Sequence, residues 1–365
     1  MWYSLIKPVF FRMDPEWIHH RVLASLAWCS RHPALLDMIH TCYGVSDPTL
    51  SIRCFGLDFP HPILLAAGLD KNAVALPAWA ALGFAGVEIG SVTALAQPGN
   101  PQPRLFRLPA DRALINRMGF NNDGAEQVAV RLAALHERVG RPRIPLGINL
   151  GKSKVTPLEE APEDYRRSMS LLWPFADYFV INVSSPNTPG LRQLQERDKL
   201  EALLEVVQTY GLQRAAPGKS KPLLLKIAPD LTSEQVDELA DLALARGLDG
   251  LIATNTTLSR AGLKTSLEQA GGLSGAPLKQ RAREVLQQLR ARVGARLPLV
   301  SVGGINSGDE VLWRLRAGAS LVQVYTGFIY EGPALISRSC KTLREAVQQA
   351  GQPSLAALLA SERRS

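Results

Sequence analysis

Eight short apolar runs recur between residues 62 and 326, and segments with helical periodicity lie between most of them. The runs do not alternate between apolar and polar residues, which is typical of strands that are buried on both faces. They are PILLAAG (62–68), GVEIGS (86–91), PLGINLG (145–151), YFVINVS (178–184), PLLLKIA (222–228), GLIATN (250–255), PLVSVGG (298–304) and SLVQVYT (320–326). Eight such strands predict an α/β fold with a closed parallel barrel, the (β/α)8 or TIM barrel, rather than an open doubly wound sheet.

The segments between and around these runs predict the remaining elements. Thr232 and Gln235 form a capping-box pattern ahead of apolar residues at helical spacing. Further helices are expected over 124–139, 194–210, 277–293, 307–317 and 334–350. Residues 49–60 predict a small β-hairpin that caps the amino-terminal end of the barrel. Two domains follow: an N-terminal helical extension, 1–46, and the barrel, 47–365.

The composition excludes several classes of protein. No run reaches the ~18 apolar residues of a membrane-spanning helix, and Asp14 and Pro15 interrupt any secretory signal. The four cysteines form no CxxC pair, which disfavours both a zinc site and a disulfide scaffold and suits a reducing compartment. The net charge is +8, but no run of five or six basic residues occurs, so nucleic-acid binding is disfavoured. We expect the chain to stay on the cytoplasmic side.

Polar side chains follow nearly every predicted strand. In a (β/α)8 barrel the carboxyl ends of all strands meet at one face, where functional residues gather. The segments at that face are AAGLDK, GSVT, GINLGKSK, INVSSPNTPG, KIAPD, ATNTT, SVGGINSG and VYTG. Ordinary turns do not require so much Asn, Ser, Thr and Lys. The sequence therefore predicts a polar site at this face, and it offers no carboxylate or histidine set with the spacing of metal ligands.

Glycines near the last strands predict a phosphate site. Loops at this position of a barrel bind phosphate through backbone N–H groups, which glycine allows to approach closely. The set is Gly272, Gly275, Gly303, Gly304 and Thr326. GINLGKS (147–153) has three residues between its glycines where a Walker A loop needs four, and GGLSG (271–275) is not a GxGxxG fingerprint. A cofactor with a single phosphate site is therefore favoured over a dinucleotide.

Several motifs together resemble those of the dihydroorotate dehydrogenase family. They are AAGLDKN (66–72), NRMGFNN (116–122), INVSSPNTPGLR (181–192), LKIAPDL (225–231), NTT (255–257), GGLSG and SVGGINSG. Among its classes, the chain is most similar to the quinone-dependent, membrane-associated one. The other class carries a cysteine base, lacks the N-terminal helices and uses fumarate or NAD-linked partners.

The resemblance implies oxidation of dihydroorotate to orotate in pyrimidine biosynthesis, with FMN as hydride acceptor and a membrane quinone as final electron acceptor. Ser185 matches the family's base, which removes the C5 proton, and Thr188 and Phe120 match residues near it. A serine hydroxyl is a poor base unless its neighbours organise the exit of its proton. The implied substrate contacts are Lys71, Asn116, Arg117, Met118, Gly119, Phe120, Asn182, Asn187, Asn255 and Thr256.

Amide side chains suit the imide edge of such a ring, and Lys71 can neutralise its carboxylate. The resemblance also implies FMN contacts. They are Ala67, Gly68, Lys71, Ser91, Asn149, Asn182, Lys226, Thr254, Gly275, Gly304, Tyr325 and Thr326. A cation at Lys226 can stabilise the anionic reduced flavin. The alternative for Lys226 is an ion pair inside the barrel mouth.

Residues 1–46 are interpreted as a membrane-docking and quinone-access module. Six aromatic residues occur in the first 28, which suits a bilayer interface. Asp14 and Pro15 predict a helix start, and a second short helix is expected near Pro33. Residues 1–50 hold four basic and four acidic residues, so docking would be apolar. By resemblance, the quinone path is lined by His19, Arg107 and Tyr325.

Three alternatives stay open at this point. The N-terminal helices could simply cover the side of the barrel. An FMN barrel that acts on RNA, such as a tRNA dihydrouridine synthase, would fit the basic charge, although that family is expected to use a cysteine acid. A barrel can also serve as a non-catalytic scaffold, because fold alone does not imply function.

Overall fold

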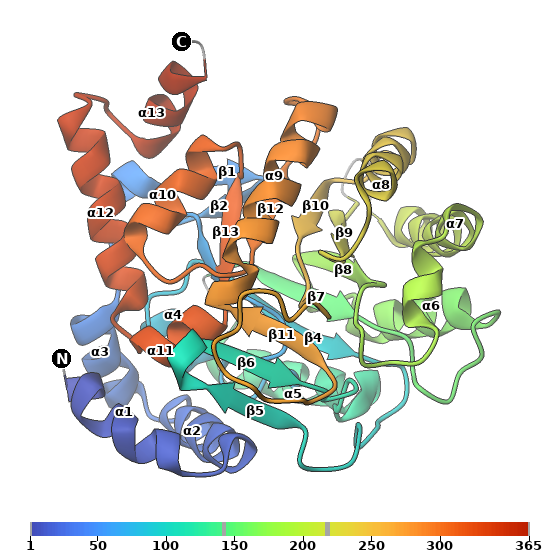
Figure 1. Cartoon of the computed structure of the whole chain (residues 1–365), viewed down its shortest axis with the longest axis horizontal. Coiled ribbons are helices and arrows are strands. Elements are labelled where there is room, and N and C mark those ends of the chain that lie inside the picture. The colour runs from blue at the N-terminus through green and yellow to red at the C-terminus, as the bar shows by residue number, and fades with distance from the viewer. Residues whose placement is uncertain (1, 141–143, 216–219, 364–365) are drawn as a thin grey trace.

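A computed structural model describes residues 2–140, 144–215 and 220–363, and the side chain of Trp2 lies outside the described part. Eight parallel strands close into a barrel in the order β10-β12-β13-β3-β4-β7-β8-β9 (Figure 1). The strands are β3 (Ile63–Leu65), β4 (Val87–Val92), β7 (Leu146–Leu150), β8 (Tyr178–Asn182), β9 (Leu223–Ile227), β10 (Gly250–Ala253), β12 (Leu299–Val302) and β13 (Leu321–Val324). Apart from the last residue of β4, each lies inside one of the eight apolar runs. The predicted (β/α)8 barrel is therefore confirmed.

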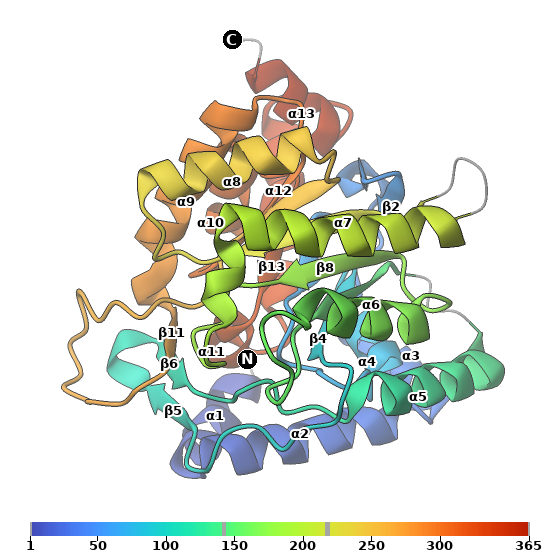
Figure 2. The same cartoon turned by 90° about the vertical axis from the view of Figure 1, so that its right-hand side faces the viewer.

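Helices surround the barrel (Figure 2). Those that match the predicted segments are α5 (Gly124–Val139), α7 (Arg197–Arg214), α8 (Ser233–Ala245), α9 (Lys279–Val293), α10 (Gly308–Arg316) and α12 (Leu335–Gln349). The capping box of Thr232 and Gln235 is formed at the start of α8. The helices that were not predicted are α4 (Leu76–Ala81), α6 (Ala161–Leu172), α11 (Thr326–Glu331) and α13 (Leu355–Glu362). Three of these have eight residues or fewer, too short for a periodic pattern to stand out.

The predicted hairpin consists of β1 (Ile52–Cys54) and β2 (Leu57–Phe59), paired antiparallel. Phe55 in its turn has its ring centroid 6.0 Å from that of Tyr178, the first residue of β8. Since the amino ends of the parallel strands lie together, the hairpin closes that end of the barrel. The cap is confirmed.

A second sheet was not predicted. Its strands are β5 (Leu105–Leu108), β6 (Ala113–Asn116) and β11 (Gly272–Gly275), antiparallel in the order β11-β6-β5. It carries Asn116 at the end of β6 and Gly275 at the end of β11, and both reach the carboxyl face of the barrel. Arg107 lies on its outer strand.

Three helices precede the barrel: α1 (Trp2–Arg12), α2 (Pro15–Cys29) and α3 (Pro33–Tyr43). Asp14 caps α2 as predicted, since its Oδ1 accepts hydrogen bonds from the backbone N of Glu16 at 3.0 Å and of Trp17 at 2.8 Å. In both views α1 and α2 lie at the lower edge of the molecule, where α2 contacts β5 of the small sheet, and α3 packs on α4 (Figures 1 and 2). No helix in the described ranges is long and apolar enough to cross a membrane.

The barrel interior changes character along its axis. Near the hairpin it is filled by apolar side chains such as Leu64, Val180 and Leu321. Closer to the carboxyl ends the buried interior side chains are polar or charged: Glu88, Asn149, Lys226 and Gln323. Layers of side chains normally fill such a barrel completely. Here the last layer is polar and forms the floor of a cavity.

Candidate active site

One cavity, the polar cavity, opens at the carboxyl end of the barrel. It brings together side chains that are far apart in the sequence, from the ends of most barrel strands and from β6 and β11. The predicted site residues that line it are Ala67, Gly68, Lys71, Ser91, Asn116, Met118, Gly119, Phe120, Asn182, Ser185, Asn187, Lys226, Thr254, Asn255, Thr256, Gly275, Gly303, Gly304, Tyr325 and Thr326.

A network of amides forms one wall. Asn182 Nδ2 donates to Ser91 Oγ at 2.8 Å and to Asn149 Oδ1 at 3.1 Å. Asn149 is fully buried behind this pair and donates to Glu88 Oε1 at 2.8 Å. On the neighbouring loop, Asn255 Nδ2 donates to Ser184 Oγ at 3.0 Å. These contacts fix the amide orientations before any ligand arrives, which is the preorganisation that a polar site needs.

Beneath the network lies a buried charged cluster. Lys226 Nζ is 3.4 Å from Glu88 Oε1, and Gln323 Nε2 donates to the other oxygen of Glu88. Sequence reasoning missed Glu88 and Gln323, although a single glutamate inside an apolar strand was a usable signal, because a buried carboxylate requires partners. The ion pair holds the ammonium group of Lys226 at the floor of the cavity, so the ion-pair and ligand-facing roles of Lys226 are compatible.

Ser185 lies in the loop after β8, only 6% exposed, and its Oγ accepts a hydrogen bond from Asn187 N at 3.3 Å. Asn187 Nδ2 in turn donates to the backbone O of Asn116 at 3.1 Å, which joins this loop to β6. The hydroxyl of Thr188 is buried and has no hydrogen-bond partner among the described residues. Thr188 does not line the cavity itself.

Lys71 supplies a second cation to the polar cavity. Burial, followed by the positive charge of Arg104, lowers the pKa of Lys71 to about 8. A bound anion would offset both effects and favour the charged lysine. The cavity is therefore suited to a ligand that carries a carboxylate beside hydrogen-bonding ring edges.

The glycine-lined side of the cavity fits a phosphorylated cofactor. Gly275 and Gly304 have positive φ angles of 101° and 72°, and an added Cβ at Gly304 would lie 2.5 Å from Lys279 Cα. The buried Thr254 Oγ1 and Gln323 Oε1 have no hydrogen-bond partner within the described ranges. Buried polar groups are normally satisfied, so these atoms fit a polar ligand in the cavity.

Of the residues predicted around the substrate and the cofactor, four do not line the polar cavity: Asn149, Thr188, Gly272 and Arg117. Gly272 lies inside the small sheet, paired with Asn116, so it is not part of the glycine-lined side of the cavity. The Arg117 side chain turns outward, stacks on the Phe106 ring at 4.8 Å and donates to Gln269 Oε1 at 2.8 Å. Within the described residues, no group of three His, Cys, Asp or Glu side chains is placed to hold a metal ion.

A second cavity, the apolar cavity, lies between the N-terminal helices and the barrel. Its lining includes Ile18, His19, Val22, Arg107 and Tyr325. Tyr325 borders both cavities. Burial, then the positive charge of Lys71, lowers the pKa of His19 to about 3. The Arg107 guanidinium donates to the backbone O of Phe10 at 2.8 Å and lies 4.9 Å from the Phe11 ring centroid, so it also anchors the end of α1.

A buried ion pair connects the N-terminal helices to the loops around the polar cavity. Glu16 of α2 and Arg104 are 4% and 8% exposed, and Arg104 Nη2 lies 2.7 Å from Glu16 Oε1. Arg104 also donates to the backbone O of Asn100 at 2.7 Å, and Asn100 Nδ2 donates to the backbone O of Asn187 at 3.2 Å. The N-terminal helices are therefore tied to the Ser185 loop through these contacts.

The chain matches known proteins along nearly its whole length. The family model described as dihydroorotate dehydrogenase matches residues 49–347. A dihydroorotate dehydrogenase (quinone) of Gloeobacter violaceus is 52% identical over 349 residues, 96% of each chain. Another, of Rhodococcus opacus, is 51% identical over 359 residues, 97% of each chain. Among solved structures, the DHODH of Eimeria tenella in complex with ferulenol has a TM-score of 0.85 and 39% identity, covering 94% of this chain and 95% of that one.

Proposed function

The chain belongs to the dihydroorotate dehydrogenase family, and from this membership we infer that it oxidises dihydroorotate to orotate, with a quinone as electron acceptor, in pyrimidine biosynthesis. It is an oxidoreductase that acts on a CH–CH bond. The observation that carries the proposal is the polar cavity, in which Ser185, four asparagine side chains and the Lys71 ammonium meet around one space.

We propose that the flavin of this enzyme is FMN, bound non-covalently, one per chain. When bound, FMN would supply the acceptor for the hydride from C6 of dihydroorotate and the two electrons that reduce the quinone. The glycine cradle of Gly275 and Gly304, with Thr326, would hold its single phosphate. Lys226 would lie beside the ring, where a cation stabilises negative charge on the reduced form.

We assign Ser185 as the base that takes the C5 proton, because it matches the base of the family and its buried side chain lines the polar cavity from the loop after β8. Lys71 pairs with the substrate carboxylate. Asn116, Asn187 and Asn255 bind the imide edge, because an amide can donate and accept at the same edge. Phe120, Met118 and Gly119 cover the cavity and exclude water.

We further propose that residues 1–46 dock on membrane lipid and admit the quinone, as a module distinct from the barrel domain 47–365. Seven of the thirteen exposed large apolar side chains among the described residues lie in this segment, including Leu5, Val9, Trp17 and Trp28. Such a density in one segment suits contact with lipid. His19, Arg107 and Tyr325 would line the quinone path, and the enzyme would sit peripherally on the cytoplasmic face of the cell membrane.

Purified protein tests the proposal directly. Heat release followed by mass measurement should identify FMN, and anaerobic dihydroorotate should bleach the flavin until a quinone is added. Release of FAD would contradict the cofactor assignment. A flavin reduced by NADPH and reoxidised by tRNA would favour the RNA-modifying alternative, and a colourless protein that does not take up FMN would favour a binding scaffold.

A further inference from the structure

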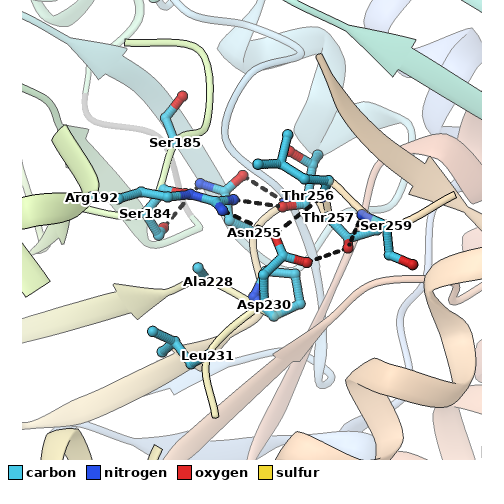
Figure 3. Close-up of polar contacts among 12 residues, drawn as sticks. Ser184, Ser185, Arg192, Ala228, Asp230, Leu231, Asn255, Thr256, Thr257 and Ser259 are labelled. Carbon is cyan, nitrogen blue, oxygen red and sulfur yellow. Dashed lines mark hydrogen bonds and ion pairs between the residues drawn. The ribbon is translucent and has the colours of Figure 1, made fainter. Parts of the chain in front are cut away.

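Arg192 lies just beyond the Ser185 loop, in the short 3-10 helix Leu191–Gln195, and its guanidinium reaches three strand-end loops at once (Figure 3). Nε donates to the backbone O of Ser184, in the loop after β8, at 3.1 Å. Nη1 donates to Oδ2 of Asp230, in the loop after β9, at 2.9 Å. Nη2 donates to the backbone O of Thr256, in the loop after β10, at 3.4 Å.

Asp230 makes further contacts with the loop after β10. Its Oδ2 accepts from the backbone N of Leu258 at 3.0 Å, and its Oδ1 accepts from the hydroxyl of Thr257. Thr257 Oγ1 also accepts from the backbone N of Ser259 at 3.0 Å. One carboxylate thus fixes residues 257–259, while the guanidinium it binds fixes residue 184.

The loop that carries Asp230 is itself anchored. Arg281 of α9 donates to the backbone O of Pro229 and of Leu231, both at 2.8 Å. Asp230 therefore offers a fixed point between two loops that carry substrate-binding residues. The pair does not belong to the cavity lining: the side chains of Arg192 and Asp230 are 24% and 23% exposed, and neither borders the polar cavity.

The loop residues that Arg192 contacts lie next to Ser185 and Asn255 in the chain. Ser184 directly precedes Ser185, and its hydroxyl accepts from Asn255. Thr256 directly follows Asn255. In Figure 3 the Ser185 side chain points away from Arg192, so the guanidinium acts on the backbone of the loop and not on the hydroxyl. The planar guanidinium group carries five N–H donors in a fixed fork, so it can serve acceptors on three different loops.

We propose that Arg192 and Asp230 are positioning residues that set Ser185 relative to Asn255 and Thr256 for proton removal. The proposal deepens the proposed function and rests on it. Without the pair, the loop after β8 can move relative to the loop after β10. A displacement of about 1 Å between reacting groups can slow a reaction on the order of 100-fold even when the chemical groups are intact.

The test separates the two half-reactions in holoenzyme variants. In Arg192→Ala, anaerobic flavin reduction by dihydroorotate should slow about 30- to 300-fold, while reoxidation by quinone and the FMN content stay within about twofold of the unsubstituted protein. Arg192→Lys should rescue little, because one ammonium cannot reach three acceptors. Arg192→Ala combined with Asp230→Ala should be no slower than the slower single variant, because the two act as one unit.

Arg292 and Asp241 provide a matched control. They form a similar ion pair, with Arg292 Nε 2.8 Å from Asp241 Oδ1, between the outer helices α9 and α8. Arg292→Ala should leave both half-reactions unchanged. Amide hydrogen exchange should accelerate at residues 184–188 and 257–259 in Arg192→Ala and at neither segment in Arg292→Ala.

Flavin reduction within twofold of normal in Arg192→Ala would overturn the inference. A parallel fall of both half-reactions with loss of FMN would also overturn it, because it would show a general structural role. If the unsubstituted holoenzyme were not reduced by dihydroorotate, the proposed function would fail, whereas unchanged exchange at residues 184–188 would separately refute the positioning role.

Discussion

The polar and apolar cavities meet at Tyr325 but are built in opposite ways. The polar cavity is assembled from strand ends of one closed barrel, and its amides are held by hydrogen bonds such as that from Asn182 to Ser91. The apolar cavity is assembled from helices that pack against the outside of the barrel, and its lining is mostly aliphatic and aromatic.

The difference shows how each cavity can select its ligand. A site made of buried polar groups rejects a ligand that leaves one of them unpaired, whereas an apolar pocket discriminates weakly among ligands of similar size. The first cavity is therefore expected to accept few ligands, and the second to accept a range of lipophilic rings. Changes that act on one cavity alone test this contrast.

Deletion of residues 1–46 should remove the apolar cavity and leave the polar cavity. Quinone reduction and liposome binding should be abolished, while flavin reduction by dihydroorotate stays measurable, because none of the residues that line the polar cavity comes from this segment. Stopped-flow absorbance measures flavin reduction and quinone reduction, and liposome flotation measures lipid binding.

A full-length protein with Leu5, Val9 and Trp17 replaced by serine serves as the milder variant, since all three are exposed. It should lose liposome binding and keep its thermal stability. Equal quinone turnover in the deleted and full-length proteins, both loaded with FMN, would refute the division between the cavities.

Ser185→Ala should damage only the polar cavity. Loss of a positioned base typically slows proton transfer about 10²- to 10⁴-fold, so flavin reduction should fall by that factor while orotate binding and quinone-driven reoxidation remain nearly intact. Ser185→Cys should retain part of the activity, with a pH optimum moved by the lower pKa of a thiol. Full activity in the alanine variant would contradict the assignment of the base.

Lys71→Ala should weaken orotate binding by about 10- to 150-fold, the range for a lost hydrogen bond to a charged group. In the unsubstituted protein the affinity should depend on pH. The pKa of Lys71 is lowered to about 8, so the lysine is charged below that pH and orotate binding should weaken as the pH rises through it. Titration of the flavin absorbance with orotate measures both effects.

Asn116→Ala is the control for Lys71, because it should weaken binding and keep the pH dependence. Both substitutions should weaken orotate binding more than FMN binding, and release of the flavin by either one would contradict that expectation. A pH-independent affinity in the unsubstituted protein would contradict the role of Lys71.

The smallest effect concerns His19. With its pKa lowered to about 3, mainly by burial, His19 is neutral from pH 5 to 8, so quinone-driven reoxidation should show no step near pH 6.5. The unfolded chain binds this proton more tightly than the folded one, so the stability contributed by neutral His19 should be lost progressively as the pH falls from about 6.5 toward 3. A step near pH 6.5 that His19→Asn removes would contradict this expectation.

The sequence predicted the barrel because its strands are buried on both faces, which gives continuous apolar runs that local reading detects. Asp14 and Thr232 marked helix starts through the backbone groups they cap. Strand β11 of the small sheet escaped prediction because it is the glycine-rich GLSG, and its partner β6 lies more than 150 residues earlier. Pairing over that distance leaves no periodic signal.

Contacts between distant residues were also missed in the candidate site. Strand-end position was enough to place Asn182, Ser185 and Asn255 at one face. The outward turn of Arg117 and the reach of Arg192 to Asp230, 38 residues away, depend on where loops lie in space. Such contacts are set by tertiary structure, and the residue types alone do not reveal them.

The position of Tyr325 between the two cavities has a kinetic consequence. With the N-terminal helices seated in lipid, as proposed, the polar cavity exchanges with bulk water and the apolar cavity with a two-dimensional phase. Occupancy of the apolar cavity then depends on the mole fraction of quinone in the bilayer and not on its amount per volume of solution. Adding inert lipid at constant total quinone would slow turnover by surface dilution, while the dependence on dihydroorotate concentration would be unchanged.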